Sequence, residues 1–416
     1  MPVIADCRMI LRSPFSAALV LVLLLSSLGS GQFMGPPVPM PEGSWRFIIA
    51  GDSRNCGDIV MPAIAANSAR YTPSFYWHLG DLRAIYKIDE DMDFAAANNG
   101  EFLSCSPYWR QAWPDFIEHQ IAPFGSLPFY VGIGNHEIIY PVDTTQFRRQ
   151  FAAWLDQESL RNQRVQDEAD DQAMGKKPEA AERSGKKKEK KEATSAEPEL
   201  PPTYFHWLLK GVDFIYLDNS SDAFFPEELE WFERVLWRDS KNDTIKSLVV
   251  GMHESLPDSL ANHHSMGDSK NPDARPTGLQ VYEDLRTFRD QNKKNVYVLS
   301  SHSHFYMEDI FATEDIRKHD DPLSGWIIGS AGAERYKLPV PASEKAKTDV
   351  YGYLVGTVSE EGTIEFKFQE IRETDVTNST RRDYPQTLVH WCFVHNSQST
   401  DYKPEDITPR CDATKK

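Results

Sequence analysis

The stretch RFIIAGDSRN, residues 46–55, joins an apolar run to a carboxylate, and similar joins recur along the chain. The apolar residues follow one another without strict alternation, which is typical of strands buried on both faces. Five further runs end in polar residues in the same way: SFYWHLGD (74–81), PFYVGIGNHE (128–137), VDFIYLDN (212–219), SLVVGMHE (247–254) and NVYVLSSHSH (295–304).

Between several of these runs the apolar spacing changes to that of helices. In QFRRQFAAWLDQ (146–157) and PEELEWFERVLWRD (226–239) apolar residues recur three and four apart, and Pro226 stands at a helix-start position. Strand, helix and strand again predict a layered α/β core. Three later runs predict more strands, with a hairpin turn near 360–362: GWIIGSAGAERY (325–336), YGYLVGTVSE (351–360) and GTIEFKFQEI (362–371).

The first residues read as a targeting segment. Two arginines precede the apolar run AALVLVLLL (17–25), and small residues follow it. This layout predicts a secretory signal peptide over 1–31, followed by a Pro/Gly-rich leader over 32–44. No later segment approaches the length that spans a bilayer. We therefore expect a secreted or periplasmic protein without a membrane span.

Four cysteines remain after the expected signal peptide: Cys56, Cys105, Cys392 and Cys411. An even number in an exported chain predicts two disulfides, and four cysteines allow three pairings. Closeness in sequence favours Cys56–Cys105 and Cys392–Cys411. We expect disulfides to anchor the mostly polar tail at 373–416.

The 416 residues carry a formal net charge of −17, and 40% of them are hydrophobic. Such a negative surface repels phosphate backbones, so we expect no nucleic-acid partner. The sequence does not indicate the oligomeric state. The segment at about 161–200 has no aromatic residue and is rich in Lys and Glu. Its composition predicts a disordered insertion within one catalytic domain.

Donor side chains stand at the ends of the predicted buried strands. Because the carboxyl ends of strands in an open α/β sheet meet at a ligand crevice, we expect these side chains to converge. Carboxylate, amide and imidazole donors suit Mn, Fe or Zn. A single Asp at a strand end is more often a helix cap or a turn residue, so the prediction depends on the whole set. The set is Asp52, Asp81, Asn135, His136, His253, His302 and His304.

The pieces GD (80–81), GNHE (134–137), the lone His253 and SHSH (301–304) resemble the calcineurin-like metallophosphoesterases. That family's pattern is D-x-H, GD, GNH[DE], H and GHxH, in this order. The resemblance implies a four-layer αββα sandwich over residues 45–372. It also implies that a phosphate ester is hydrolysed by attack of a metal-bound hydroxide.

The resemblance further implies a role for each matched residue. Two divalent or trivalent ions (Fe, Mn or Zn) would bind, with Asp81 bridging them. His136 would act on the ester, oriented by Glu137, and we expect His264 to touch the substrate. The first ion would be held by Asp52, Asp81 and His304, and the second by Asp81, Asn135, His253 and His302.

One departure from the family pattern concerns Arg54, which stands where the first motif has a metal-binding His. The related purple acid phosphatases also lack that His but supply a Tyr three residues after the bridging Asp, where this chain has Ala84. Arg54 then either turns outward as a clamp on the phosphate or occupies the first ion's place, leaving one ion. We favour the clamp, which makes Arg54 both catalytic and substrate-binding.

Three functions remain open from the sequence. The leading one is a phosphatase acting on a small phosphorylated substrate. The same fold also serves phosphodiesterases and nucleotide pyrophosphatases, and the loops that would distinguish them are not readable. The third is a binding protein whose catalysis is disabled at Arg54, although His136 and the outer histidines would then have no purpose.

Overall fold

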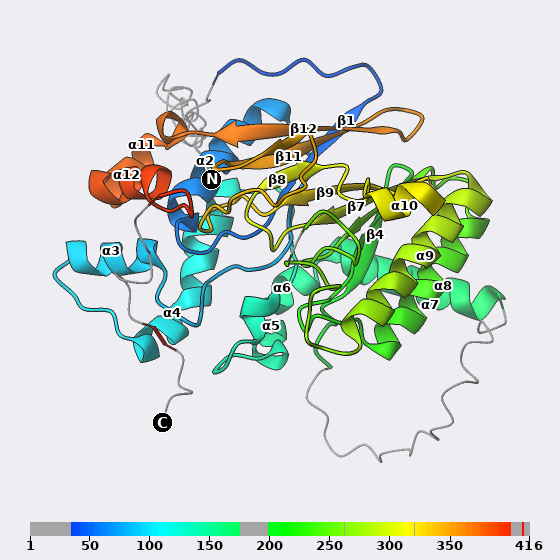
Figure 1. Cartoon of the computed structure of the whole chain (residues 1–416), viewed down its shortest axis with the longest axis horizontal. Helices are drawn as coiled ribbons and strands as arrows, with labels where there is room; N and C mark the ends of the chain where they lie inside the picture. The colour runs from blue at the N-terminus through cyan, green and yellow to red at the C-terminus, as the bar shows by residue number, and fades with distance from the viewer. Residues whose placement is uncertain (1–34, 175–198, 262, 320, 401–409, 412–416) are drawn as a thin grey trace, which may run out of the picture.

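The computed structural model describes residues 35–174, 199–261, 263–319, 321–400 and 410–411 (Figure 1). The signal peptide predicted at 1–31 lies outside the described residues. Within the described ranges, no helix combines the length and the apolar character that a membrane span requires.

The first sheet has five strands in the order β12-β11-β1-β2-β3. Its three N-terminal strands are parallel, and the β11–β12 hairpin is antiparallel to β1. The hairpin closes through a turn in which Gly362 has a φ of +85°. The strands are β1 (Trp45–Ala50), β2 (Tyr76–His78), β3 (Phe129–Val131), β11 (Tyr351–Val358) and β12 (Ile364–Ile371).

The second sheet has seven strands in the order β10-β8-β9-β7-β6-β5-β4. Strands β5, β6, β7 and β9 are parallel, and antiparallel strands complete both edges. The strands are β4 (Phe205–Leu209), β5 (Val212–Tyr216), β6 (Ser247–Gly251), β7 (Asn295–Ser300), β8 (Tyr306–Glu308), β9 (Ser324–Ile328) and β10 (Ala346–Lys347).

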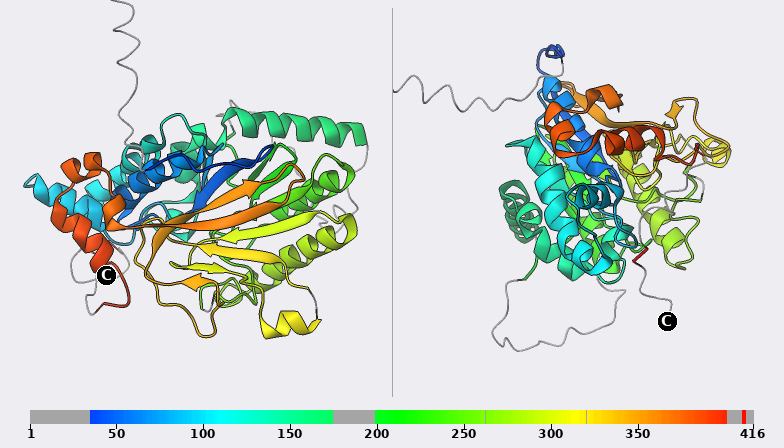
Figure 2. Two further views of the ribbon diagram at one scale, coloured as in Figure 1. Left: turned by 90° about the horizontal axis from the view of Figure 1, so that it is seen from above. Right: turned by 90° about the vertical axis from the view of Figure 1, so that its left-hand side faces the viewer.

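The two sheets pack face to face (Figure 2), and aromatic side chains from both sheets meet between them. The Phe47 ring of β1 lies 5.0 Å from the Phe214 ring of β5, edge to face. At one margin Tyr130 stacks on Trp207 at 3.8 Å, and at another Trp326 lies 4.5 Å from Phe366. Edge-to-face and stacked pairs of this kind add to the stabilisation from buried area.

Helices cover the outer face of each sheet, which confirms the predicted four-layer αββα sandwich. The outer face of the seven-stranded sheet packs on α8 and α9 through a second apolar core. In α8 the buried Leu229, Phe232 and Leu236 recur at helical spacing, which places them on one face. The helices are α2 (Gly57–Ser68), α3 (Glu90–Asn98), α4 (Cys105–Phe116), α5 (Thr144–Gln150), α6 (Ala152–Leu155), α7 (Glu158–Met174), α8 (Pro226–Lys241), α9 (Ala274–Asn292), α10 (Glu314–His319), α11 (Asn378–Asp383) and α12 (Gln386–Val394).

The prediction of disorder over 161–200 was wrong for its first part. Residues 161–174 continue helix α7, although Val165 in this stretch is 63% exposed. Ion pairs hold the helix in place of apolar burial. Asp167 pairs with His206 of β4 at 2.8 Å and with Arg238 of α8 at 3.1 Å. Residues 175–198 lie outside the described residues.

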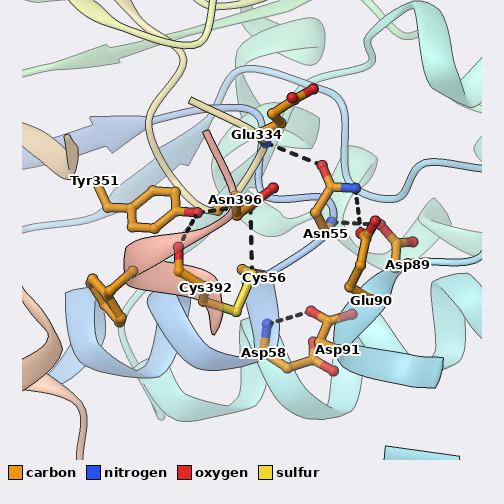
Figure 3. The surroundings of a disulfide bond; sticks show 12 residues. Asn55, Cys56, Asp58, Asp89, Glu90, Asp91, Glu334, Tyr351, Cys392 and Asn396 are labelled. Carbon is orange, nitrogen blue, oxygen red and sulfur yellow. Dashed lines mark hydrogen bonds between the residues drawn. A yellow bond between two sulfur atoms is a disulfide. The ribbon is translucent and has the colours of Figure 1, made fainter. Parts of the chain in front are cut away.

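The disulfide pairing expected from closeness in sequence was also wrong. The bonds are Cys56–Cys392 and Cys105–Cys411, with Cα atoms 5.9 and 5.4 Å apart. Sequence neighbourhood failed because the polar tail folds back over the N-terminal half of the chain (Figure 3). Tyr384 of the tail donates a hydrogen bond to Asp58 in α2. The structure therefore agrees that the tail is anchored by disulfides, but to distant cysteines.

Candidate metal centre

The donor residues predicted from the strand ends do converge. Loops from both sheets meet at the carboxyl ends of their parallel strands, as expected for this architecture. Asp52, Asp81 and the Asn135–His136 pair follow β1, β2 and β3 of the first sheet. His253 and the two last histidines follow β6 and β7 of the second.

Three of these residues hold a left-handed backbone, with φ of +60° at Asp52, +58° at Asp81 and +63° at His302. Such a conformation costs about 1–2 kcal/mol in a residue that has a Cβ atom. Surrounding packing has to maintain it, and strain of this kind concentrates at functional sites. Gly134 leaves room for the Asp81 side chain, because a Cβ atom at position 134 would lie 2.3 Å from Asp81 Oδ1.

The first group of donors contains Asp81, Asn135, His253 and His302, which we call cluster A. His253 Nε2 lies 3.0 Å from Asn135 Oδ1, 3.2 Å from Asp81 Oδ1 and 3.1 Å from His302 Nδ1. The opposite ring atom, His253 Nδ1, lies 3.0 Å from the carbonyl oxygen of Leu79. Because a carbonyl only accepts, the proton belongs on Nδ1 and the lone pair on Nε2.

While His253 is neutral, its Nε2 lone pair, the Asn135 amide oxygen and the Asp81 carboxylate meet in cluster A without a donor among these three groups. A carboxylate oxygen, an amide oxygen and an imidazole lone pair meet within about 3 Å, which is a repulsive arrangement unless a cation lies between them. Burial by itself would lower the pKa of His253, but the Asp81 carboxylate raises it to about 10. The site thus attracts positive charge strongly, and a metal ion fits this set of nitrogen and oxygen donors.

The second group contains Asp52, Asp81 and His304, which we call cluster B. His304 Nδ1 lies 2.7 Å from the carbonyl oxygen of Glu334, so its Nε2 carries the lone pair. That lone pair lies 3.2 Å from Asp52 Oδ1. Within the described residues, buried Asp52 Oδ1 and Asp81 Oδ2 accept no hydrogen bond. Burial alone would raise the pKa of Asp52, but His304 keeps it below its usual value.

Arg54 points into cluster B. Its Nη2 lies 3.1 Å from His304 Nε2, and its Nε lies 3.8 Å from Asp81 Oδ2. Its Nη1 donates to the hydroxyl of Tyr86 at 3.4 Å. Only 6% of the residue is exposed. The guanidinium therefore lies inward among the donor residues, where an outward-turned clamp was expected.

His136 lies beside Asp81, with its Nε2 3.5 Å from Asp81 Oδ2. Its Nδ1 donates to the carbonyl oxygen of Ala84 at 2.6 Å, which fixes the ring. Glu137 was predicted to orient His136, and its carboxylate accepts hydrogen bonds from the backbone N–H groups of Asp81 and Leu82, both at 2.9 Å, and of Gly134 at 2.8 Å. Its carboxylate holds the Asp81 loop because it satisfies three amides at once.

No protein-family model matches the chain, and no curated protein matches its sequence. Among solved structures, the chain is similar to purple acid phosphatase PPD1 from yellow lupin (Lupinus luteus) seeds, with a TM-score of 0.49 and 15% identity. That match covers 80% of this chain and 53% of the lupin chain, so this chain spans about half the length of that protein.

Two further solved structures are similar. PhoD matches with a TM-score of 0.44 and 14% identity over 86% of this chain and 78% of its own. A metallophosphoesterase from Sphaerobacter thermophilus matches with a TM-score of 0.27 and 11% identity, over 83% of this chain and 97% of its own. Because these TM-scores are low, we rest the functional proposal on the side chains of the site.

Aromatic residues lie beside the donor residues of the site. Tyr336 lies 4.0 Å from the ring of His304, and Tyr86 lies 5.3 Å from the ring of His136. The predicted substrate-binding residue His264 joins them, with its ring 5.2 Å from Tyr336 and 5.5 Å from His302. His264 thus lies beside the donor residues.

Two supporting residues were missed because their partners are far away in the sequence. Asn219 is buried, and its Oδ1 accepts from the backbone N–H of His253 at 3.1 Å, which positions that loop. Arg83 is fully buried. It pairs with Asp58, Asp91 and Asp115 of α2, α3 and α4.

Proposed function

We propose that the chain is a metal-dependent phosphoesterase of the calcineurin-like superfamily, a hydrolase that acts on small phosphorylated substrates. The observation that carries the proposal is cluster A. There the Nε2 atom of His253, the amide oxygen of Asn135 and a carboxylate oxygen of Asp81 converge within about 3 Å. This arrangement attracts positive charge, and a metal ion satisfies all three groups at once.

The chemistry of the donors limits which ions fit. Imidazole and carboxylate donors without a cysteine favour Mn, Fe or Zn over a purely structural zinc site. When bound, such an ion supplies a Lewis acid that activates water and neutralises charge on a phosphoryl oxygen. In this proposal Asp81, Asn135, His253 and His302 hold it, and Asn219 and Glu137 keep the supporting loops in position.

His136 is the proposed catalytic side chain. Because Ala84 fixes its Nδ1–H, the Nε2 atom is the one that faces the ester. In its imidazolium form His136 carries a second proton on Nε2, and from there it donates to the oxygen that leaves. We also propose export, which the N-terminal sequence pattern and the two disulfides support.

The test combines metal content with hydrolysis of an aryl phosphate and of the matching diester. We expect bound metal in the purified protein and turnover that chelation abolishes and added Mn²⁺ restores. His253→Ala should lose both metal and turnover, whereas His390→Ala, on the exposed side of α12, should keep both.

The two substrates also separate the alternatives. Preference for the monoester supports a phosphatase, and preference for the diester supports a phosphodiesterase on the same fold. Metal binding without turnover of either substrate contradicts the enzyme and favours a binding protein. A chain that binds no metal at all contradicts the whole proposal.

A further inference from the structure

We infer that the guanidinium of Arg54 takes the place of a first metal ion, so that the centre binds one ion, in cluster A. This inference rests on the proposed function and changes its metal content from two ions to one. It also gives Arg54 a role different from that of an outward-facing clamp.

The first support is that Arg54 already occupies the lone pair of His304. His304 Nδ1 is committed to the carbonyl oxygen of Glu334, so Nε2 is the ring atom that could bind an ion. Arg54 Nη2 lies 3.1 Å from that atom and can only donate. A metal ion bound by His304 would have to displace this hydrogen bond and would then lie against a fixed positive charge.

The second support is the match between unpaired atoms. Arg54 Nε and Asp81 Oδ2 are both buried, and neither has a hydrogen-bond partner within the described residues. They face each other at 3.8 Å, so a shift of about 1 Å forms a charge-assisted hydrogen bond between them. The guanidinium of Arg54 then contacts both His304 and Asp81, and its positive charge offsets one of the two carboxylate charges of cluster B.

The third support is the way in which Arg54 is held. It is 6% exposed, and its Nη1 donates to Tyr86. Its Cζ lies 6.0 Å from the centroid of the Tyr86 ring, within reach of a cation–π contact. Turning the guanidinium out of the cluster would break these contacts together with the one to His304.

The fourth support is the charge of the buried centre. The carboxylates of Asp52 and Asp81 bring two negative charges, which the backbone N–H groups of His302 and His136 stabilise by donating hydrogen bonds to them. Arg54 returns one positive charge, since a guanidinium stays protonated in proteins. A single divalent ion then leaves the centre with one net positive charge, which suits a phosphate dianion. A second ion would leave three in a buried space, and uncompensated buried charge is costly.

Cluster A differs from cluster B in this respect. The contacts that fix His253 come from neutral groups, namely the carbonyl of Leu79, the hydroxyl of Ser301 and the side-chain amide of Asn219. Its acceptors therefore remain available to an ion. Cluster A takes the metal ion, and Arg54 supplies the second positive charge beside it.

The experiment counts ions in the full-length protein loaded with Mn²⁺ and freed of excess metal. Elemental analysis gives the number of ions per chain, and electron paramagnetic resonance distinguishes an isolated Mn²⁺ from an exchange-coupled pair. We expect one ion per chain and an isolated signal for the wild type. Arg54→His, which restores the family motif, should give two ions and a coupled signal.

Arg275→His is the matched control, because Arg275 forms an exposed ion pair with Asp258 and should leave the count at one. Two ions in the wild type would overturn the inference and leave the proposed function intact. One ion in Arg54→His would also overturn it, since Arg54 would then not be what excludes the second ion. No ion in the wild type would overturn the proposed function itself. If Arg54→His does not fold, the wild-type signal still decides between an isolated ion and a pair.

Discussion

His206 Nε2 lies 2.8 Å from the carboxylate of Asp167, and this ion pair joins strand β4 to helix α7. On its other side His206 Nδ1 lies 2.8 Å from Asp213. The imidazole is thus enclosed between two carboxylates. Burial by itself would lower the pKa of His206, but Asp213 and Asp167 raise it to about 10.

This arrangement predicts a stability that falls as the solution becomes alkaline. The folded pKa of His206 is raised above the unfolded value of about 6.5, so its contribution is complete below about pH 6.5. It is lost as the pH rises toward about 10, by an amount on the order of 3–5 kcal/mol. Urea unfolding of the wild type and of His206→Gln at about pH 6, 8 and 10 measures this.

The difference between the two proteins is the quantity that matters, because other groups titrate in the same range. We expect the wild-type advantage to be largest at pH 6 and to shrink at pH 10. An advantage that stays constant with pH would show that His206 is neutral in the folded protein. In His206→Gln, detachment of α7 from the fold should be detected as increased proteolysis near residue 171.

The sequence was sufficient for the strands that carry the site. Runs such as 46–52 and 295–304 are buried on both faces, so their continuous apolar character is a local property. The donor residues follow them directly, and strand ends in a parallel sheet share one edge. That is why all six metal ligands predicted from the sequence lie together in the structure. The helix at 226–241 also begins at its proline, as its sequence predicts.

Other features depend on contacts that composition does not reveal. The second half of helix α7 is mostly polar, and its order depends on the ion pairs of Asp167 and Asp171 with distant His206 and Arg238. Strand β4 was missed although FHWLL is mostly apolar, and the edge strands β8 and β10 were missed because they are only three and two residues long. The pairing of Cys56 with Cys392 spans 336 residues, and neighbourhood is a poor guide over such a distance.

Arg83 should be among the residues least tolerant of substitution. It is fully buried and pairs with three aspartates from three helices. Arg83→Met leaves these carboxylates without their cation, and breaking a buried ion pair from one side costs about 3–5 kcal/mol. Arg275→Met, which removes an exposed pair, should cost less than about 1 kcal/mol. Denaturant unfolding measures both losses. Equal losses in the two variants would show that Arg83 is not the buried cation that stabilises these three aspartates.

The two disulfides should differ in their resistance to reduction. Cys56 and Cys392 are fully buried, whereas Cys105 is partly exposed beside the end of the chain. Because thiol–disulfide exchange needs access to a sulfur atom, a mild reductant should open Cys105–Cys411 first. Mass spectrometry after maleimide labelling identifies the cysteines. Labelling of Cys56 and Cys392 at the same rate under native conditions would contradict the burial of that bond.

The last prediction separates chemistry from metal binding at His136. The ring is fixed by the Ala84 carbonyl, and its Nε2 approaches Asp81 only to 3.5 Å, so we treat it as an acid–base group beside the metal centre. His136→Ala should therefore retain the metal content of the wild type while kcat for the preferred ester falls by roughly 10²–10⁴-fold. His302→Ala serves as the contrast, since it removes a proposed ligand and should lower the metal content. If His136→Ala lost metal to the same extent, His136 would be a ligand, and the division of roles at the centre would have to be redrawn.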